Sequence, residues 1–535
     1  MNAPLAAAST PTFAVTTGAA VRAALSAGQE IALLDVREEA PFALAHPLFA
    51  ANLPLGRIEL EALERIPRLS TQLVIYDNGE GLAVRAAQRL QQLGYTQISL
   101  LADGLAGWRN GGGEIFQDVN APSKAFGELV EAQRHTPSLS AEEVQALLDA
   151  KADVVVVDAR RFDEYNTMNI PGSRSVPGGE LVLRIRDLAP DPATRVIVNC
   201  AGRTRSIIGT QSLVNAGLPN PVTALRNGTI GWTLAGQSLE RGQTRRAGDY
   251  SPDARAWAAP QARDLADRTG VQRLDLAGLR QLQAETHRTT YLFDVRDPAE
   301  YAAGHLPAFI NAPGGQLVQE TDHVAPVRGA RIVLVDDDGV RANMAAHWLA
   351  QMNWTVWVLD GVAAKAFSET GARVPLRPAV GNVARITPRQ VQPQLQNGRV
   401  VLVDLSPSPR YRKGHIAGAW FALRTGLEHA DLPAAEHYVL TSTDGVLAAY
   451  AAAEHPTLHG ARVSVLDGGN QAWLDAKLPL ETENARYASA AEDVYRRPYE
   501  GTDNAVAAMQ AYLDWEYGLV AQLGIDGTHG FKVLQ

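Results

Sequence analysis

The chain has a single cysteine among its 535 residues, and aromatic residues make up only 6% of it. One thiol cannot form a disulfide within the chain, and Cys and His nowhere occur at the paired spacing of a structural zinc site. We therefore expect no disulfide framework and no metal, and no motif indicates a cofactor. With so few aromatic side chains, the cores must consist mostly of alanine, leucine and valine.

Basic runs and long hydrophobic runs are absent as well. No Lys/Arg-rich segment occurs and the net charge is −9, so nucleic acid is not expected as a partner. No uninterrupted apolar stretch reaches the roughly 18 residues of a membrane span. Residues Met1–Ala6 lack the basic start and apolar core of a signal peptide. These absences predict a cytoplasmic protein with a reduced thiol and no membrane association.

The one cysteine, Cys200, ends the apolar run Val196–Asn199 and is followed by a loop of small residues with Arg203 and Arg205. A strand that ends in such a loop places the thiol among backbone N–H groups beside positive charge. This arrangement stabilises a thiolate and binds a small anion. The alternative is a buried inert thiol, because free cysteine behaves as a small hydrophobe. The two arginines and Gly202 favour the reactive role.

One structural unit is repeated four times along the chain. Each copy has an apolar strand that ends in an acidic turn, at domain-sized intervals. These strand ends are Leu33–Arg37, Val156–Arg160, Leu292–Arg296 and Leu402–Ser406. A second apolar strand and a helical stretch follow in each copy, and the second strands are Leu73–Tyr76, Val196–Asn199, Ile332–Val335 and Tyr438–Thr441. Short buried strands that alternate with helices predict parallel sheets with crossover helices.

Two further marks recur in the same order. A turn of the Gly-His-Ile/Leu-Pro type comes between the two strands, and an Asp/Asn-Gly pair with a tryptophan closes the unit. The turns are Asn169–Ser173, Gly304–Ala308 and Gly414–Gly418, with a degenerate version at His46. The closing tryptophans are Trp108, Trp232 and Trp473, and the third unit has Lys365 there instead. The turn histidines His305 and His415 lack a second ligand nearby, so we expect a turn-stabilising hydrogen bond rather than metal binding.

On these marks, the four units resemble rhodanese domains. The resemblance implies an α/β fold in which each unit is a mostly parallel five-stranded sheet flanked by helices, with the catalytic cysteine after a central strand. The expected domains are residues 12–120, 136–246, 268–376 and 384–483, followed by a C-terminal helical extension over 484–535. Residues 120–135 and 248–270 are expected to join units. Adjacent units are expected to face one another, so that the first walls the cleft of the second.

In the extension, Asp503 is expected to cap a helix with one apolar face. The positions of that face are Val506, Met509, Leu513, Tyr517 and Val520. The face is expected to pack on a neighbouring unit, and the alternative is that it binds a partner helix.

Only the second unit keeps the nucleophile of the resembled family. Alignment of the strands places Asp77, Asp336 and Ser442 where Cys200 stands. A carboxylate there cannot accept sulfur and repels an anionic donor. The resemblance therefore implies one active site on a body of four domains.

The resemblance also implies the chemistry of a sulfurtransferase. The Cys200 thiolate would attack the sulfane sulfur of an anionic donor, and the resulting persulfide would pass the sulfur to an acceptor. Arg203 and Arg205 would bind the oxygens of the donor, and the basic loop favours thiosulfate over mercaptopyruvate. The loop members Ala201, Gly202, Thr204 and Ser206 complete the predicted substrate site through N–H groups and hydroxyls, although Thr204 and Ser206 could simply shape the loop.

Arg160 allows two interpretations. Its position matches a strand-end arginine that helps to bind thiosulfate in the resembled family. Equally, it could form a salt bridge with Asp158 or Glu164.

No second cysteine can discharge the persulfide, so the acceptor must be external: a low-molecular-weight thiol, cyanide, or a sulfur-acceptor protein. A phosphatase is a weaker alternative, because related phosphatases carry an arginine at the sixth loop position, where this chain has Ser206. The remaining alternative is a non-catalytic scaffold that uses Cys200 as a persulfide carrier or sensor.

Overall fold

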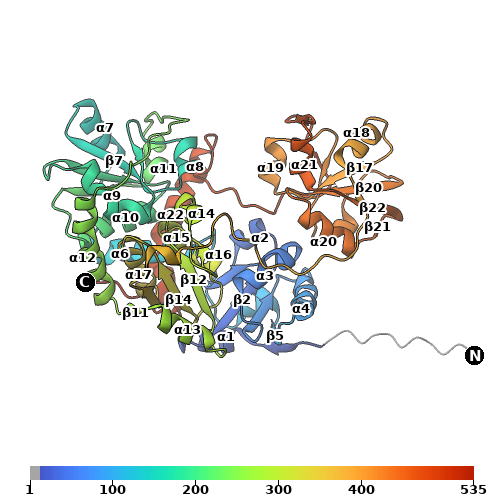
Figure 1. Cartoon of the computed structure of the whole chain (residues 1–535), viewed down its shortest axis with the longest axis horizontal. Helices are drawn as coiled ribbons and strands as arrows, with labels where there is room; N and C mark the ends of the chain where they lie inside the picture. Colours follow the sequence, from blue (N-terminus) through green and yellow to red (C-terminus); the bar gives the residue numbers. More distant parts are fainter. Residues whose placement is uncertain (1–11) are drawn as a thin grey trace, which may run out of the picture.

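The computed structural model describes residues 12–535, and the Met1–Ala6 stretch considered above lies outside them. Four α/β units follow one another along the chain, each built on its own sheet (Figure 1). The first three sheets have five parallel strands in the orders β1-β5-β4-β2-β3, β6-β10-β9-β7-β8 and β11-β15-β14-β12-β13. The expected fold of four tandem units is thus confirmed.

The strands of these three sheets are short and mostly buried. In unit 1 they are β1 (Ala14–Thr16), β2 (Ile31–Asp35), β3 (Ala50–Asn52), β4 (Gln72–Tyr76) and β5 (Gln97–Leu101). In unit 2 they are β6 (Ser138–Leu139), β7 (Val154–Asp158), β8 (Arg174–Ser175), β9 (Arg195–Asn199) and β10 (Val222–Leu225). In unit 3 they are β11 (Gln272–Leu274), β12 (Thr290–Asp294), β13 (Ile310–Asn311), β14 (Arg331–Val335) and β15 (Thr355–Leu359).

Unit 4 enlarges the same plan. Its five central strands are β16 (Arg385–Ile386), β22 (Ala461–Leu466), β20 (His437–Thr441), β17 (Val401–Asp404) and β19 (Trp420–Phe421), in spatial order. A further parallel strand, β24 (Arg486–Tyr487), extends the edge, and β21 (Thr457–Leu458) pairs antiparallel with β22. A separate two-stranded sheet joins β18 (His415–Ile416) to β23 (Leu480–Glu481).

Helices cover the sheets and connect the units. In unit 1 they are α1 (Gly18–Ser26), α2 (Glu39–Leu44), α3 (Ile58–Arg65), α4 (Leu82–Gln92) and α5 (Gly104–Asn110). In unit 2 they are α7 (Ala141–Asp149), α8 (Phe162–Thr167), α9 (Leu181–Leu188), α10 (Thr204–Asn215) and α11 (Gly228–Leu234). In units 3 and 4 they are α13 (Leu276–Ala284), α14 (Pro298–Ala303), α15 (Gly314–Gln319), α16 (Thr321–Val324), α17 (Arg341–Gln351), α18 (Pro388–Gln396), α19 (Ser408–Lys413), α20 (Val446–Glu454) and α21 (Gly469–Asp475).

Two long helices outside the sheets, α6 (Ala121–Arg134) and α12 (Pro252–Arg268), occupy the segments expected to join units. A capping box of Ser140 and Glu143 opens α7. None of the helices formed by residues 12–535 is long and apolar enough to span a bilayer.

Unit 1 does not wall the cleft of unit 2, which corrects that expectation, although units 2 and 3, also neighbours along the chain, do pack against each other. Unit 2 instead meets unit 3 through two equivalent glycine turns, and a Cβ on Gly179 would lie 2.7 Å from the backbone nitrogen of Gly315. Unit 1 meets unit 4, where Arg424 pairs with Glu59 at 2.6 Å. These paired contacts use the same part of each unit, the segment after the third strand, which the sequence pattern does not mark as an interface.

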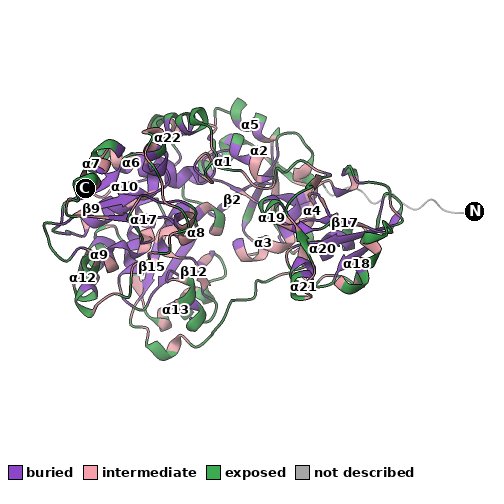
Figure 2. Ribbon diagram, turned by 90° about the horizontal axis from the view of Figure 1, so that it is seen from above, coloured by how far each residue is buried: buried purple, intermediate pink, exposed green. Residues whose placement is uncertain are grey.

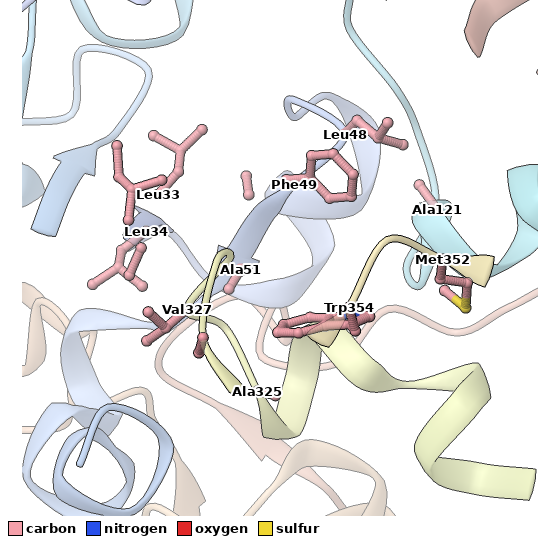
Figure 3. Packing of buried hydrophobic residues seen from close by; sticks show 14 of the residues in the cluster. Leu33, Leu34, Leu48, Phe49, Ala51, Ala121, Ala325, Val327, Met352 and Trp354 are labelled. Atoms are coloured by element: carbon pink, nitrogen blue, oxygen red, sulfur yellow. The ribbon is translucent and has the colours of Figure 1, made fainter. Parts of the chain in front are cut away.

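Units 1 and 3 share a continuous core with α6. Figure 3 shows Phe49 and Leu33 of unit 1 facing Val327 and Trp354 of unit 3, with Ala121 of α6 beside them. The buried residues lie along the sheets and between the units, whereas the outer helices expose one face (Figure 2). Units 1 and 3 therefore pack directly against each other and against α6.

The C-terminal extension leaves unit 4, contacts unit 1 and covers unit 2 with α22 (Val506–Asp526) (Figure 1). Its last residues reach α17 of unit 3, where the N–H of Lys532 donates to the carbonyl of Gln351 at 2.8 Å. Helix α22 packs on α6 and on the loop of Cys200, so the expected docking on other units is observed. Its buried face differs from the predicted one, since Val506 and Tyr517 are exposed while Tyr512 and Glu516 are buried. Asp503 does not cap the helix, because α22 begins at Val506 with Ala505 at the cap and Asp503 binds Arg496.

Candidate active site

Cys200 lies between the end of β9 and the start of α10, as predicted, and only 2% of its surface is exposed. The first turn of a helix has N–H groups without partners in the helix. Burial raises the pKa of the Cys200 thiol, and the backbone N–H and hydroxyl of Ser206 in this turn act against that rise. The sulfur therefore lies at a helix N-terminus, where negative charge is stabilised.

Arg205 is the guanidinium that faces the thiol, and Glu164 of α8 holds it. The Glu164 carboxylate accepts from both terminal nitrogens of Arg205, at 2.7 and 2.9 Å. Although burial acts to raise it, Arg205 and its neighbours bring the pKa of Glu164 down to about 2. Arg205 is thus a fixed positive charge in the position predicted for it.

The Cys200 thiol is not a ready thiolate in this arrangement, which corrects the expectation from the sequence. Burial raises the pKa of Cys200 above its ordinary value, and this effect outweighs the opposing effects of Arg205 and Ser206. The nearby Glu516 adds to the rise. The sequence showed the arginine but not the depth at which the loop is covered.

Arg203 points away from the thiol, toward α6. Its guanidinium donates to Glu128 at 2.7 and 2.8 Å and also pairs with Glu131. The remaining donors reach Asn227 and Tyr517, each at 3.0 Å. Because all these nitrogens have partners, Arg203 joins the loop to α6 and α22. Its side chain is therefore not placed to contact a donor, although the sequence had predicted that contact.

Arg160 follows the second of its two interpretations. Its guanidinium donates to the carboxylate of Asp158 at 2.7 and 2.9 Å and to the carbonyl of Met168 at 2.6 Å. Arg37 and Arg296 make the same pair with Asp35 and Asp294 in units without a thiol. The pair is therefore a feature of the fold that fixes the strand end.

The small loop residues serve packing as well as the site. Ala201 lies in an apolar cluster with α22, and Gly202 faces Tyr512 so closely that a Cβ would lie 3.0 Å from its ring. The Thr204 methyl lies against Gly127 of α6, where it leaves no space for a Cβ. Ser206 donates its hydroxyl to the carbonyl of Arg203 at 2.8 Å. Thr204 and Ser206 thus shape the loop, as one of the predicted alternatives states.

The other units show what happens at the same position without cysteine. Asp77 accepts from the N–H of Ala83 at 2.9 Å, and Asp336 accepts from the N–H of Ala342 at 2.8 Å. Ser442 accepts from the N–H six residues on at 3.3 Å. Each of these side chains caps the helix that follows its own strand. The alignment with Cys200 is confirmed, and the helix terminus is already occupied in these units.

The sequence matches the family described as "Rhodanese-like domain" over residues 18–111, 140–235, 277–364 and 387–476. The chain belongs to the rhodanese-like family. Among solved structures, a thiosulfate sulfurtransferase from Pseudomonas aeruginosa is 64% identical with a TM-score of 0.96, and the match covers 98% of this chain and 100% of that one. A protein from Bacillus halodurans is 21% identical with a TM-score of 0.18, over 21% of this chain and 85% of that one. No curated protein sequence matches the chain.

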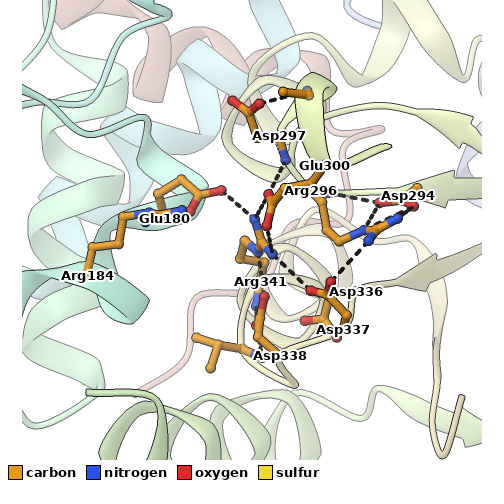
Figure 4. A network of polar contacts seen from close by, with 12 residues as sticks. Glu180, Arg184, Asp294, Arg296, Asp297, Glu300, Asp336, Asp337, Asp338 and Arg341 are labelled. Carbon is orange, nitrogen blue, oxygen red and sulfur yellow. Dashed lines mark hydrogen bonds and ion pairs between the residues drawn. The ribbon is translucent and has the colours of Figure 1, made fainter. Parts of the chain in front are cut away.

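The third rhodanese-like unit keeps part of the site. Arg341 occupies the place of Arg205 and pairs with Glu300 as Arg205 pairs with Glu164 (Figure 4). Here the arginine is also held by Asp338 within the loop and by Glu180, which reaches across from unit 2 at 3.0 Å. The arginine of this unit is enclosed by carboxylates, so it holds units 2 and 3 together.

The turn histidines of these rhodanese-like units act as expected. The Nδ1 atoms of His305 and His415 lie 2.9 Å from the carbonyl oxygens of Tyr301 and Tyr411, and each ring stacks on that tyrosine. The histidines are therefore part of the turn.

Sequence reasoning missed the residues that cover the catalytic loop from the extension. Tyr499, Tyr512 and Glu516 are buried against it, and Lys124 of α6 lies 5.1–5.6 Å from the ring centres of Tyr499, Tyr512 and Trp515. Because the extension lies outside the repeats, no internal comparison could reveal them. The one available signal was the aromatic content of residues 495–517.

Proposed function

We propose that the chain is a sulfurtransferase that moves sulfane sulfur from thiosulfate through a Cys200 persulfide to an external acceptor. The single observation that carries the proposal is the position of this one thiol at the N-terminus of α10 beside Arg205. The similarity to the Pseudomonas aeruginosa thiosulfate sulfurtransferase supports the choice of donor.

The proposed reaction has two steps, each with balanced bonds. After the thiol loses its proton, the Cys200 sulfur attacks the outer sulfur of thiosulfate; a new S–S bond forms and the S–S bond of the donor breaks. Sulfite leaves with the electron pair of that bond, and Arg205 stabilises its negative charge. In the second step an acceptor thiolate or cyanide attacks the outer sulfur of the persulfide, and the electron pair returns to Cys200 as a thiolate.

Arg205 alone carries the proposed contact with the donor. All three arginines form ion pairs, but Arg205 is the one whose charge acts on Cys200, so we assign to Arg203 and Arg160, paired with Glu128 and Asp158, the role of holding the loop and the strand end. The backbone N–H groups of the loop hold the persulfide anion.

The test is the mass of the intact protein after incubation with thiosulfate, together with a thiocyanate assay. A gain of about 32 Da that disappears when cyanide is added establishes the persulfide cycle. Cys200→Ser should lose both signals while it keeps its fold. Absence of the mass gain in the native protein would contradict the proposal.

The second candidate is a persulfide carrier or scaffold without its own turnover. The observation in its favour is the burial of Cys200, which is 2% exposed beneath the extension. A carrier would release at most one thiocyanate per loaded Cys200 and would not turn over repeatedly with thiosulfate, which the same assay shows.

A further inference from the structure

Cys200 is closed off from a sulfur donor by the packing around its loop. Two cavities flank this loop, one of about 40 Å³ on the side of Thr204 and Arg205 and one of about 190 Å³ between α11 and the extension. Neither has Cys200 in its wall, and the thiol itself is buried. The donor has to contact the sulfur, so a part of the structure that covers the loop must move.

The cover over the loop is the half of α22 that precedes Gly518. Its buried side chains form one small apolar cluster with the loop and its neighbours, consisting of Met509, Tyr512 and Leu513 with Ala201, Ile230 and Tyr499. On the side of α6, Lys124 lies over the rings of Tyr512 and Trp515, 5.1 and 5.5 Å from their centres. The hydrogen bonds of this half to unit 2, within residues 12–535, are both made by the hydroxyl of Tyr517, at 3.0 Å. Opening this half therefore breaks a small cluster and leaves the main core intact.

The half of α22 after Gly518 is fixed to the body of the molecule. Leu519 and Leu523 belong to the large core that units 1 and 3 share. Beyond the helix, the ring of Phe531 packs against that of Phe126, with 5.4 Å between the ring centres. This half therefore keeps its place when the first half moves.

Gly518 lies at the boundary between the two halves. It is exposed, and a Cβ added there would meet no atom within 4 Å, so packing does not require glycine at this position. Glycine inside a helix lowers the stability of the helix relative to alanine and makes a change of backbone angles easier. At the other end, Gly501 has a φ of +77° within residues 498–505, which form neither helix nor strand and contribute one wall of the 190 Å³ cavity. The cover thus has a glycine at each end.

We propose that the half of α22 before Gly518, together with residues 498–505, is a lid that bends at Gly518 to admit the sulfur donor and closes over the persulfide. This inference rests on the proposed function, because it states how the donor reaches Cys200. The closed lid buries the persulfide with its loop and so excludes water and competing thiols while the sulfur is held.

Hydrogen exchange of the full chain tests the lid without any turnover. Once it leaves the loop, a segment of this length is too short to stay helical in water, so its amides exchange with deuterium. We expect the amides of residues 509–513 to exchange at least about tenfold faster than those of residues 519–523. Equal protection of the two stretches would overturn the lid.

Gly518→Ala tests the hinge, because alanine favours the straight helix of the closed lid. Exchange of the amides of residues 509–513 should slow about three- to fivefold in this variant. Gly524→Ala is the matched control, because Gly524 is exposed on the same helix beyond the hinge and its Cβ would also meet no atom within 4 Å. Exchange at 509–513 should keep its native rate in the control. Equal exchange rates in the two variants would overturn Gly518 as the hinge.

Turnover provides the second readout. The value of kcat/KM for thiosulfate should fall about three- to fivefold in Gly518→Ala and stay native in Gly524→Ala, because the donor enters only through the open lid. A native value in Gly518→Ala would overturn the lid as the route of the donor. Failure of the proposed function looks different, because the native protein would then gain no sulfur from thiosulfate while residues 509–513 still exchanged in a Gly518-dependent way.

Discussion

At four equivalent positions, a side chain lies at the N-terminus of the following helix, and three different kinds of residue occur there. Asp77, Asp336 and Ser442 accept a hydrogen bond from the N–H six residues on, and Cys200 presents a sulfur to the same place. Asp77 and Asp336 meet this N–H with a carboxyl oxygen of the chain itself. In unit 2 the sulfur takes that position, where the helix N-terminus would stabilise an anion formed on Cys200.

The raised pKa of Cys200 sets the pH dependence of persulfide formation. Burial raises the pKa above its ordinary value of 9.0, so the thiolate fraction is small at neutral pH and grows as the pH rises. We expect the single-turnover rate with thiosulfate to increase about tenfold per pH unit between pH 7 and 9. Mass spectrometry of quenched samples measures this rate.

Ser206→Ala is the companion variant. The Ser206 hydroxyl acts to lower the pKa of Cys200. Its loss should therefore shift the pH profile of the single-turnover rate to higher pH. A rate that is already flat at pH 7 would contradict the raised pKa.

Arg205 and Arg341 form a matched pair for substitution. Each is held by a glutamate of its own unit, yet only Arg205 faces a thiol. We expect Arg205→Gln to lower kcat/KM for thiosulfate about 100-fold, because a positioned charge that stabilises the leaving sulfite is lost. Arg341→Gln removes a comparable buried pair and should lower the Tm without that kinetic loss. Equal kinetic effects in the two variants would remove Arg205 from the site.

At this scale the sequence predicted the place of Cys200 between β9 and α10, the position of Arg205 and the equivalence with Asp77 and Asp336. It could not predict the direction of Arg203, because its partners Glu128 and Glu131 belong to a helix before the unit. An arginine in a loop has the same sequence signal whether it faces a substrate or an ion pair.

At the scale of elements, α22 is the one that changes the properties of the active unit. It buries Glu516 against the catalytic loop, where one carboxylate oxygen accepts from Tyr512 at 2.8 Å and the other has no partner. Burial raises the pKa of Glu516 to about 8, with Lys124 opposing and Glu128 adding to the rise, and Arg203 also faces it. The repeats predicted every unit of the fold, yet they contain no information about this helix. Its buried face was predicted correctly at Met509 and Leu513 and wrongly at Val506 and Tyr517.

The stability of the protein should depend on Glu516 in a defined pH range. Above 4.5 the unfolded chain releases this proton while the folded protein holds it up to about pH 8, so stability falls as the pH rises through this range. Glu516→Gln keeps the neutral form, so its Tm should fall less than that of the native protein between pH 6 and 9. The resulting difference in the free energy of unfolding amounts to a few kcal/mol, because each pKa unit contributes on the order of 1.4 kcal/mol.

Asp514→Asn is the control for this prediction, because Asp514 is exposed on the same helix and accepts a hydrogen bond only from Gln510. Thermal unfolding followed by circular dichroism measures both variants. Parallel Tm curves for the native protein and Glu516→Gln would show that the carboxyl is ionised when buried, against the expectation.

For the whole molecule, the pairing of units 2 and 3 places a unit without cysteine against the unit that carries Cys200. Gly179 and Gly315 meet at this contact, and Arg341 of unit 3 bonds Glu180 of unit 2. The sequence shows four copies but not their partners, because equivalent units carry equivalent surfaces and the choice between them depends on a few side chains such as Glu180. The expected pairing of unit 1 with unit 2 was therefore wrong, whereas units 2 and 3, also neighbours along the chain, do meet.

A methyl group at this contact should loosen the whole assembly. In Gly179→Ala the new Cβ would lie 2.7 Å from the backbone of Gly315, and a backbone atom cannot move aside as a flexible side chain does. We expect a loss of about 1–3 kcal/mol in stability, as for other overpacked interfaces. Gly248→Ala, with no atom within 4 Å of its Cβ, is the control and should retain the native Tm. Equal Tm values for the two variants would show that the contact between units can adjust.

Because the only thiol is buried beneath the extension, its labelling can report how often the extension opens. Any thiol-specific reagent can attach at one address, Cys200, and it can do so only when α22 and its neighbours have moved off the loop. The labelling rate at saturating reagent then equals the frequency with which the extension opens. The effects of ligands, pH and substitutions on this opening can all be compared through the labelling rate, without any measurement of turnover.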